Sequence, residues 1–446
     1  MGESNKINKI CERIRIVTDH ETLEGIKLPS KEKGVIFIKL DSGYNVGVKE
    51  ETIKRIDITG QLHPDAGDEG ETGSSQDVKH NPKLPTIAIL HTGGTIASKV
   101  DYRTGGVIAR FAPEELLAMF PELSKICSIT SRLLSNMFSE DMRFAHYKIM
   151  AHAIASEIQQ GVKGIILTHG TDTLHYTAAA LSFMLENLSV PVLLVGAQRS
   201  SDRGSSDAGS NLIAAAHFIA KTDFRGVAIC MHKNPSDKQC VILPATKTRK
   251  MHTSRRDAFQ AINTKPYAFV DYEKGTIEKL APFPLPSEKK LAVREHFEET
   301  VGIITCHPNM FPEAFAYYRK ENYKGLVIEG TGLGQAPVGV PNKECAIHNQ
   351  ILEEIRKLVE SGCVVVMVSQ CIYGRVHMHV YSNAIDLLKV GVIPAEDMTT
   401  ETAFIKLAWL LGNYPVEQAR KLFEQNLRGE ISERTPYEEH FAPDFS

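Results

Sequence analysis

The sequence lacks any apolar run that approaches the roughly 18 residues needed to cross a membrane. It also lacks an apolar leader, because the opening MGESNKINK is polar and Lys6 stands where a myristoylation signal has Ser or Thr. Its 8 cysteines include no CxxC pair, and most of them lie in apolar runs, as buried free thiols of a reducing compartment do. These absences predict a cytoplasmic protein without a membrane anchor.

An excess of charge of one sign is missing as well. The 51 Lys and Arg residues face 54 Asp and Glu residues, so the formal net charge is −3. A chain this close to neutrality does not hold a polyanion through its field alone. A GK[ST] phosphate-binding loop is absent, and GTGLGQ (330–335) carries glutamine where the dinucleotide motif has its third glycine. We therefore expect no cofactor in this chain, and we expect any nucleic acid to be bound mainly by a partner.

Changes of sequence pattern divide the 446 residues into five parts. Residues 1–60 consist of short alternating runs between turn residues, which predicts a small all-β barrel module used for docking or support rather than for RNA binding. Residues 61–84 are polar and rich in Gly, Asp and Ser, which is typical of a linker. Two α/β domains are expected at 85–286 and 287–430, separated near the Pro-rich APFPLP. The acidic stretch 431–446 is predicted to be a solvated tail, with partner docking as the alternative.

The two α/β domains show continuous rather than alternating apolar strands, which indicates parallel sheets covered by helices on both faces. Expected helices lie at 173–188 and 211–220. Expected strands lie at 86–90, 164–168, 191–196, 302–306, 325–329 and 363–368.

Polar clusters directly follow three of these strands, at 91–98, 168–173 and 330–335. Ligands of open parallel sheets bind beyond the carboxyl ends of the strands, so each cluster is a candidate site. A threonine hydroxyl becomes a nucleophile only when an oriented base removes its proton. The glycines before Thr95 allow the backbone to approach a substrate and to turn N–H groups toward an oxyanion. Thr171 and Asp172 place a hydroxyl beside a carboxylate at a helix start, where a simple N-cap is the alternative.

Two of the clusters resemble the signature motifs of the asparaginase/glutaminase amidohydrolase family. The motifs are TGGTIAS (92–98) and HGTDTL (169–174). The resemblance extends over essentially all of residues 85–430, through VGAQR (195–199), SSDAGSNL (205–212), TRKMHTSRRDAF (248–259), QCIYGRV (370–376) and AEDMTTETAFIKL (395–407). It implies a two-domain α/β body and four catalytic residues, Thr95, Thr171, Asp172 and Lys250. The family lysine stands nine residues before the Phe of the DAF-like element, which selects Lys250 and not Lys247.

The resemblance also implies roles for these residues. Thr95 is assigned as the acyl acceptor, while Thr171, Lys250 and Asp172 form the relay that activates water and protonates the leaving ammonia; the reverse assignment of the two threonines stays open. Lys250 can act as a base only in its neutral form.

The family pattern further implies a substrate-binding set. Ser139 and Glu140 are expected to bind the α-carboxylate and α-amine, with a helix cap as the alternative for Ser139. Gly94 and Gly170 complete the set. No metal site is expected, because His377 and His379 lack further ligands at suitable spacing and a structural role is favoured for them.

Two departures from free-standing asparaginases change the interpretation. The loop after the first motif carries Val107 about where those enzymes have a tyrosine, and Tyr102 is near but out of register, which suggests a lid that closes only under control. The N-terminal module has no counterpart in them. It resembles instead the leading domain of the D-type subunits of archaeal-type glutamyl-tRNA(Gln) amidotransferases.

That second resemblance covers the whole chain and implies a division of labour. The D-type subunit is a glutaminase that passes ammonia from L-glutamine to the E-type subunit, which binds the tRNA and uses ATP and Mg²⁺ to amidate glutamyl-tRNA(Gln). The resemblance further implies a dimer of the D-type chains within a two-plus-two assembly. The alternatives are a stand-alone L-asparaginase and a non-catalytic docking protein.

Overall fold

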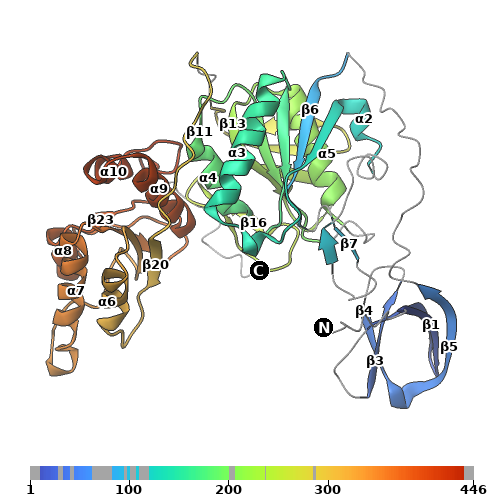
Figure 1. Ribbon diagram of the computed structural model, residues 1–446, viewed down its shortest axis with the longest axis horizontal. Coiled ribbons are helices and arrows are strands. Elements are labelled where there is room, and N and C mark those ends of the chain that lie inside the picture. Colours follow the sequence, from blue (N-terminus) through green and yellow to red (C-terminus); the bar gives the residue numbers. More distant parts are fainter. Residues whose placement is uncertain are drawn as a thin grey trace, which may run out of the picture.

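The computed structural model describes residues 11–28, 34–40, 45–62, 83–94, 98–100, 107–109, 120–199, 206–236, 238–284 and 288–435. Figure 1 shows a small β module, a large central α/β domain and a second α/β domain at the C-terminal side of the chain. None of the helices within this part of the chain is long and apolar enough to cross a membrane.

The N-terminal module is an antiparallel sheet that curls on itself (Figure 1). Its described strands run in the spatial order β4-β3-β2-β1-β5, and the pairings leave β4 and β5 as edges. Ile14 and Ile16 point inward from one strand because side chains alternate along it, and they meet Ile38 and Val48 in a small core. The strands are β1 (Cys11–Thr18), β2 (Thr22–Leu28), β3 (Val35–Leu40), β4 (Asn45–Lys49) and β5 (Ile53–Leu62), with the short helix η1 (Glu50–Thr52).

The central domain is built on a mixed sheet of eight described strands in the order β18-β17-β14-β13-β12-β10-β6-β9. The five strands from β9 to β13 are parallel, whereas β14, β17 and β18 are antiparallel. The strands are β6 (Thr86–His91), β9 (Ser128–Leu133), β10 (Gly164–Thr168), β12 (Pro191–Val195), β13 (Gly226–His232), β14 (Gln239–Pro244), β17 (Ala268–Asp271) and β18 (Thr276–Lys279).

Helices cover both faces of this sheet, and β10 shows why successive residues Ile165, Ile166 and Leu167 are all apolar. Ile165 and Leu167 face one core with α3 (Phe144–Gln159) and α4 (Leu174–Met184). Ile166 faces a second core with α2 (Leu123–Ile126) and α5 (Ala208–Lys221). A strand buried on both faces needs an apolar residue at each position, which is the pattern seen in the sequence.

The C-terminal domain has a parallel sheet of four described strands in the order β20-β21-β22-β23. It comprises β20 (Val301–Thr305), α6 (Glu313–Lys320), β21 (Gly325–Gly330), η4 (Lys343–Cys345), α7 (His348–Glu360), β22 (Val364–Ser369), α8 (Ser382–Lys389), β23 (Ile393–Pro394), α9 (Thr400–Asn413) and α10 (Val416–Phe423). Helix α9 lies against α4 of the central domain (Figure 1), where Trp409 stacks on Phe183 at 5.5 Å between ring centres. The two α/β domains therefore share one hydrophobic core.

Short paired segments complete the described structure. They are β7 (Ser98–Val100) with β8 (Val107–Ala109), β11 (Leu185–Glu186) with β19 (Ala292–Val293), β15 (Thr248–Lys250) with β16 (Phe259–Ala261), and the helix η3 (Ser139–Asp141). Ile431 packs against the shared core and the Ser432 amide donates to Asp397, so the first residues of the stretch expected to be a tail contact the body.

The predicted fold class is confirmed, with one difference. The central sheet is mixed rather than parallel, because β13 and β14 are joined by a connection too short for a helical crossover, and such a connection can pair strands only in the antiparallel sense.

Candidate active site

The two signature motifs meet because the strands that precede them are neighbours. β6 and β10 pair in parallel with His91 opposite Thr168, so the loops that follow both strands leave the same edge of the sheet. The Thr92 hydroxyl donates to the Thr168 carbonyl at 2.9 Å and ties the first loop to the second. The predicted site at the carboxyl ends of these strands is therefore assembled from segments far apart in the sequence.

Glycines allow these loops to touch through their backbones. A Cβ on Gly94, whose φ is +82°, would lie 2.5 Å from the Cα and N of Gly170. A Cβ on Gly170 would in turn lie 2.8 Å from the Cβ of Ser139. Any larger side chain would separate the loops, so Gly94 and Gly170 have a demonstrable steric role beside the substrate-binding role predicted for them.

Three of the four predicted catalytic residues form one cluster. Lys250 Nζ lies 2.9 Å from Thr171 Oγ1 and 2.7 Å from Asp172 Oδ1. The side chain of Lys250 is only 10% exposed, whereas that of Asp172 is 64% exposed. An amine that contacts both a hydroxyl and a carboxylate is placed to exchange a proton with the hydroxyl while the carboxylate orients it.

Lys250 reaches the cluster from β15, where its cross-strand partner is Phe259. The spacing from Phe259 that selected Lys250 thus corresponds to a real pairing in the hairpin. Lys247, the nearby alternative, is 1% exposed and pairs with Asp397 of the C-terminal domain. Burial lowers the pKa of Lys247, and the charge of Asp397 opposes that shift. Lys247 is therefore committed to the domain interface.

The helix-cap alternatives can be judged from α4 and η3. The N-cap of α4 is Thr173, whose hydroxyl donates to the Ser139 carbonyl at 2.6 Å rather than capping the helix. Thr171 and Asp172 precede the cap and are free for other contacts. Ser139 is the first residue of η3 and is buried, with Phe138 as the N-cap, so it does not cap this helix.

A cavity of about 650 Å³ is lined by residues of α3 and α4 and by sequence neighbours of Ser139 and Asp172, but not by Thr171, Asp172 or Lys250. Glu140 and Thr173 line it near the catalytic loops, while Phe404 and Glu299 line it from the C-terminal side. Ser139 lies against Gly170 and Thr173, and Glu140 lines the cavity; their contacts to substrate stay predictions.

A buried polar network supports the site from behind. The Asp207 carboxylate accepts from the amides of Gln198 and Arg199 and from the Asn211 side chain, which also donates to the Gly196 carbonyl at 3.0 Å. A Cβ on Gly196 would lie 2.8 Å from the Thr171 methyl group. Gly196 of the VGAQR segment thus lies against Thr171, and Asp207 and Asn211 hold that segment in place.

Two buried histidines lie where β6 and β10 end: His91 is the last residue of β6, and His169 directly follows β10. His91 contacts the hydroxyls of Thr168 and Ser131 at 3.0 and 2.9 Å, and His169 contacts the Thr177 hydroxyl at 2.9 Å. Burial lowers the pKa of each histidine to about 4. Both are therefore neutral components of the scaffold. Motif matching did not single them out, since it points to the reacting groups.

The buried histidines make stability depend on pH. The unfolded chain binds a proton at each with a pKa near 6.5, whereas the folded protein does so only at about 4. Their contribution is complete above the unfolded pKa and is lost as pH falls toward the folded pKa. We expect the free energy of unfolding to decrease by on the order of 3 kcal/mol between about pH 7 and about pH 5. Denaturant titrations at both pH values measure this change, and His169→Gln should remove about half of it. An undiminished difference between the two pH values in that variant would contradict the attribution to the buried histidines.

Other predicted residues fall away from the cluster or outside the described residues. Thr95 and Tyr102 lie outside the described residues, so their positions stay predictions. Val107 pairs with Val100 in the β7–β8 hairpin. The segment 330–335 turns back on itself through a Thr331–Gln335 bridge at the end of β21, in the other sheet.

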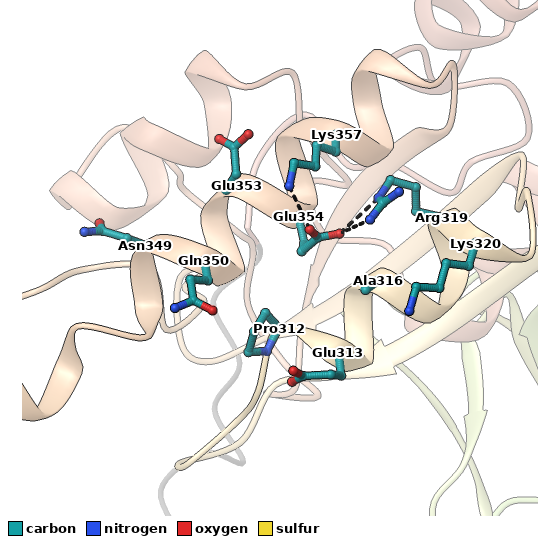
Figure 2. A pocket seen from close by; sticks show the side chains of 10 residues that line it. All are labelled: Pro312, Glu313, Ala316, Arg319, Lys320, Asn349, Gln350, Glu353, Glu354 and Lys357. Atoms are coloured by element: carbon teal, nitrogen blue, oxygen red, sulfur yellow. Dashed lines mark hydrogen bonds and ion pairs between the residues drawn. The ribbon is translucent and has the colours of Figure 1, made fainter.

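Two further features are not catalytic centres. His377 and His379 are not in a strand, because residues 370–381 form an irregular connection with turns between β22 and α8. In the described part of the chain, no cluster of three or more His, Cys, Asp or Glu residues could hold a metal ion. A groove of about 580 Å³ between α6 and α7 is shown in Figure 2, where Glu354 pairs with Arg319 and Lys357. It carries none of the predicted catalytic residues.

Comparison with known proteins gives matches along most of the chain. The family described as Asparaginase, N-terminal, matches residues 86–282, and the Glutaminase/Asparaginase C-terminal domain matches residues 300–423. The GatD N-terminal domain matches residues 9–59. The D-type subunit of the glutamyl-tRNA(Gln) amidotransferase of Pyrococcus furiosus is 44% identical over 95% of this chain and 94% of its own length. The chain belongs to the GatD family, the D-type subunits of glutamyl-tRNA(Gln) amidotransferase.

Further relatives support this membership, and the resemblance to the D-type subunits that the sequence predicted is confirmed. The GatD protein of Thermofilum pendens is 40% identical and covers 98% of both chains. Among solved structures, a thermostable L-asparaginase from Thermococcus kodakarensis superposes with a TM-score of 0.67 at 31% identity, covering 78% of this chain and 99% of that enzyme. The L-asparaginase I of Vibrio cholerae gives a TM-score of 0.67 at 28% identity over 78% of this chain and 99% of its own. The asparaginases thus match the two-domain body, whereas the GatD relatives match nearly the whole chain.

Proposed function

We propose that this chain is the glutaminase subunit of a tRNA-dependent amidotransferase, and that Thr95, Thr171, Asp172 and Lys250 carry out the hydrolysis of L-glutamine. The contact of Lys250 Nζ with Thr171 Oγ1 at 2.9 Å carries the proposal, because it joins a hydroxyl to an amine that can move its proton. The GatD relatives match nearly the full length of the chain, including the N-terminal module. This favours glutaminase activity in an amidotransferase over the activity of a stand-alone asparaginase.

The reaction has two halves. A threonine hydroxyl oxygen, assigned to Thr95, attacks the side-chain amide carbon of glutamine; the C–N bond breaks, and ammonia leaves with the proton from that hydroxyl. Water then attacks the resulting ester, releasing glutamate and restoring the hydroxyl. Thr171, Lys250 and Asp172 form the relay that protonates the leaving ammonia in the first half and activates water in the second, while Asp172 orients Lys250 and binds the substrate amine. Backbone N–H groups at Gly94 and Gly170 are the proposed donors to the oxyanion.

The remaining steps are assigned to other molecules. We infer that ammonia passes to the E-type subunit of the amidotransferase, which binds glutamyl-tRNA(Gln) and uses ATP and Mg²⁺ to amidate it, while this chain uses no cofactor of its own. The net charge of −3 supports this arrangement, because it leaves the polyanion to the partner. We further propose a cytoplasmic two-plus-two assembly in which two copies of this chain form a dimer.

A glutaminase assay with and without the partner tests the proposal. We expect slow glutamine hydrolysis by the chain alone and a marked rise when the E-type partner and glutamyl-tRNA(Gln) are added, with asparagine as the control substrate. Full hydrolysis of asparagine that does not depend on the partner would favour the asparaginase alternative instead. Absence of hydrolysis under every condition would favour a docking protein that has kept the fold.

A further inference from the structure

The segment that carries Lys250 is attached to the C-terminal domain. The Thr246 carbonyl accepts from the Thr402 hydroxyl at 2.9 Å, and Lys247 Nζ donates to the Asp397 carbonyl at 3.2 Å. Arg249 Nε lies 3.3 Å from Glu401 Oε1. Three of the four residues that precede Lys250 are therefore held by the loop before α9 and by the first turn of that helix.

Glu401 has a special place among these contacts. Its Oε1 atom lies 3.3 Å from Arg249 Nε and also 3.7 Å from Nε2 of His175. Arg249 directly precedes Lys250 on β15. His175 is the second residue of α4 and follows Asp172 by three residues. One carboxylate oxygen from the C-terminal domain thus contacts both elements that carry the catalytic cluster.

The alternation of side chains along β15 explains how such a contact can act on Lys250. Neighbouring residues of a strand point to opposite faces, so holding Arg249 toward Glu401 directs Lys250 to the other face. Phe259, the cross-strand partner of Lys250, makes an edge contact with the His175 ring at 6.3 Å. The hairpin and the start of α4 are therefore coupled by packing as well as by charge.

Glu401 is costly to bury, which argues against a role in stability alone. The residue is 6% exposed, and neither its Oε2 atom nor Nδ1 of His175 has a hydrogen-bond partner within the described structure. Burial by itself would raise the pKa of Glu401, yet its contacts with His175 and Arg249 hold that pKa below its ordinary value. An ionised, incompletely paired carboxylate at a domain interface is a poor choice for stabilising that interface.

We propose that Glu401 is a positioning residue for glutamine hydrolysis: from the C-terminal domain it holds the Lys250 strand and the first turn of α4 in register, so that domain docking sets the distance from Lys250 Nζ to Thr171 Oγ1. This inference rests on the function proposed above. It also names a structural element through which a partner bound to the C-terminal domain can affect the catalytic cluster of the central domain.

The test compares Glu401→Gln with Glu186→Gln in the complex with the E-type partner. Glu186 follows the opposite end of α4 and pairs with Arg294 and Arg428 at 3.1 and 3.2 Å, so its variant also removes an ion pair between the central domain and later parts of the chain. We expect Glu401→Gln to lower kcat for glutamine by about 10- to 100-fold with little change in KM, because a shift of about 1 Å in a reacting group has effects of this size. Glu186→Gln should leave kcat unchanged.

A second variant keeps the test decisive if Glu401→Gln folds poorly. Arg249→Met removes the ion-pair partner of Glu401. The Arg249 side chain is 32% exposed, and we expect this variant also to lower kcat. The double variant should lose little more than either single one, since both act through one contact. Wild-type kcat in Glu401→Gln and Arg249→Met, or an equal loss in Glu186→Gln, would overturn the inference.

Amide hydrogen exchange separates this inference from the proposed function. We expect Glu401→Gln to speed exchange in the peptides covering 246–251 and 170–177, and Glu186→Gln to leave them unchanged. Faster exchange in a protein without glutaminase activity would reject the proposed function but keep Glu401 as the element that orders both segments. Unchanged exchange together with unchanged kcat rejects the role of Glu401.

Discussion

Lys250→Met should reduce glutamine hydrolysis by about 10³-fold or more while leaving the protein folded. The substitution removes the amine that lies 2.9 Å from Thr171 Oγ1 and 2.7 Å from Asp172 Oδ1, but keeps a side chain of similar length. General acid–base groups contribute about 10²- to 10⁴-fold to rates, and this amine serves both halves of the reaction in the proposed scheme. Steady-state release of glutamate by the complex measures the effect.

Lys233→Met is the matched control for this experiment. Lys233 belongs to the same domain but contacts Gln239 and the Phe269 ring, outside the catalytic cluster, so its loss should not affect turnover. Thr171→Val should give a loss similar to that of Lys250→Met, and the double variant should lose little more, because residues that act as a unit are not additive. More than about a tenth of the activity left in Lys250→Met would show that another group moves the proton.

Glu430→Gln should give the largest loss of stability. Lys406 on α9 and Glu430 are both fully buried, at 0% exposure, and their charged atoms lie 2.6 Å apart. Burial lowers the pKa of Lys406, and Glu430 opposes that shift. Removing Glu430 leaves the Lys406 charge buried without an anionic partner, beside the carbonyls of Phe423 and Gln425, which typically costs about 3–5 kcal/mol.

Denaturant unfolding measures this loss, and the single tryptophan gives a local signal. Trp409 lies on α9 in the shared core, so its emission reports on the region around Lys406. Adding Lys406→Met to Glu430→Gln should recover part of the stability, because no buried charge is then left unpaired. Removing the exposed Lys389–Asp386 pair should have little effect. Equal losses at the buried and the exposed pair would contradict the argument.

The elements of the fold were largely predictable from local patterns. The strand predicted at 164–168 is β10 (Gly164–Thr168), and the helix predicted at 173–188 corresponds to α4. Such patterns report which residues must be buried, and burial is decided over a few neighbouring positions. The antiparallel half of the central sheet was not predicted, since strand direction depends on connections and on pairing partners rather than on the apolar run itself.

The candidate site shows the same division. Thr171, Asp172 and Lys250 were identified from the family resemblance, and the family's spacing for Lys250 works because it counts residues within one hairpin. Glu401 and His175 were not picked out, although both lie in or beside quoted motifs. Their partnership joins parts of the chain that meet only when the two domains dock, and no local pattern records that contact.

By itself, the sequence determined the fold class, the family resemblance and the chemical groups of the site, because these depend on local burial and on residue types placed after strand ends. Only the tertiary structure decided that the Gly94 and Gly170 loops touch and that Glu401 contacts both catalytic elements. It also decided that Lys247 pairs with Asp397 while Lys250 reaches Thr171. The physical reason is that these distances are set by the packing of α9 on α4 and by strand neighbours. Such contacts arise from the whole folded chain and not from any single segment of it.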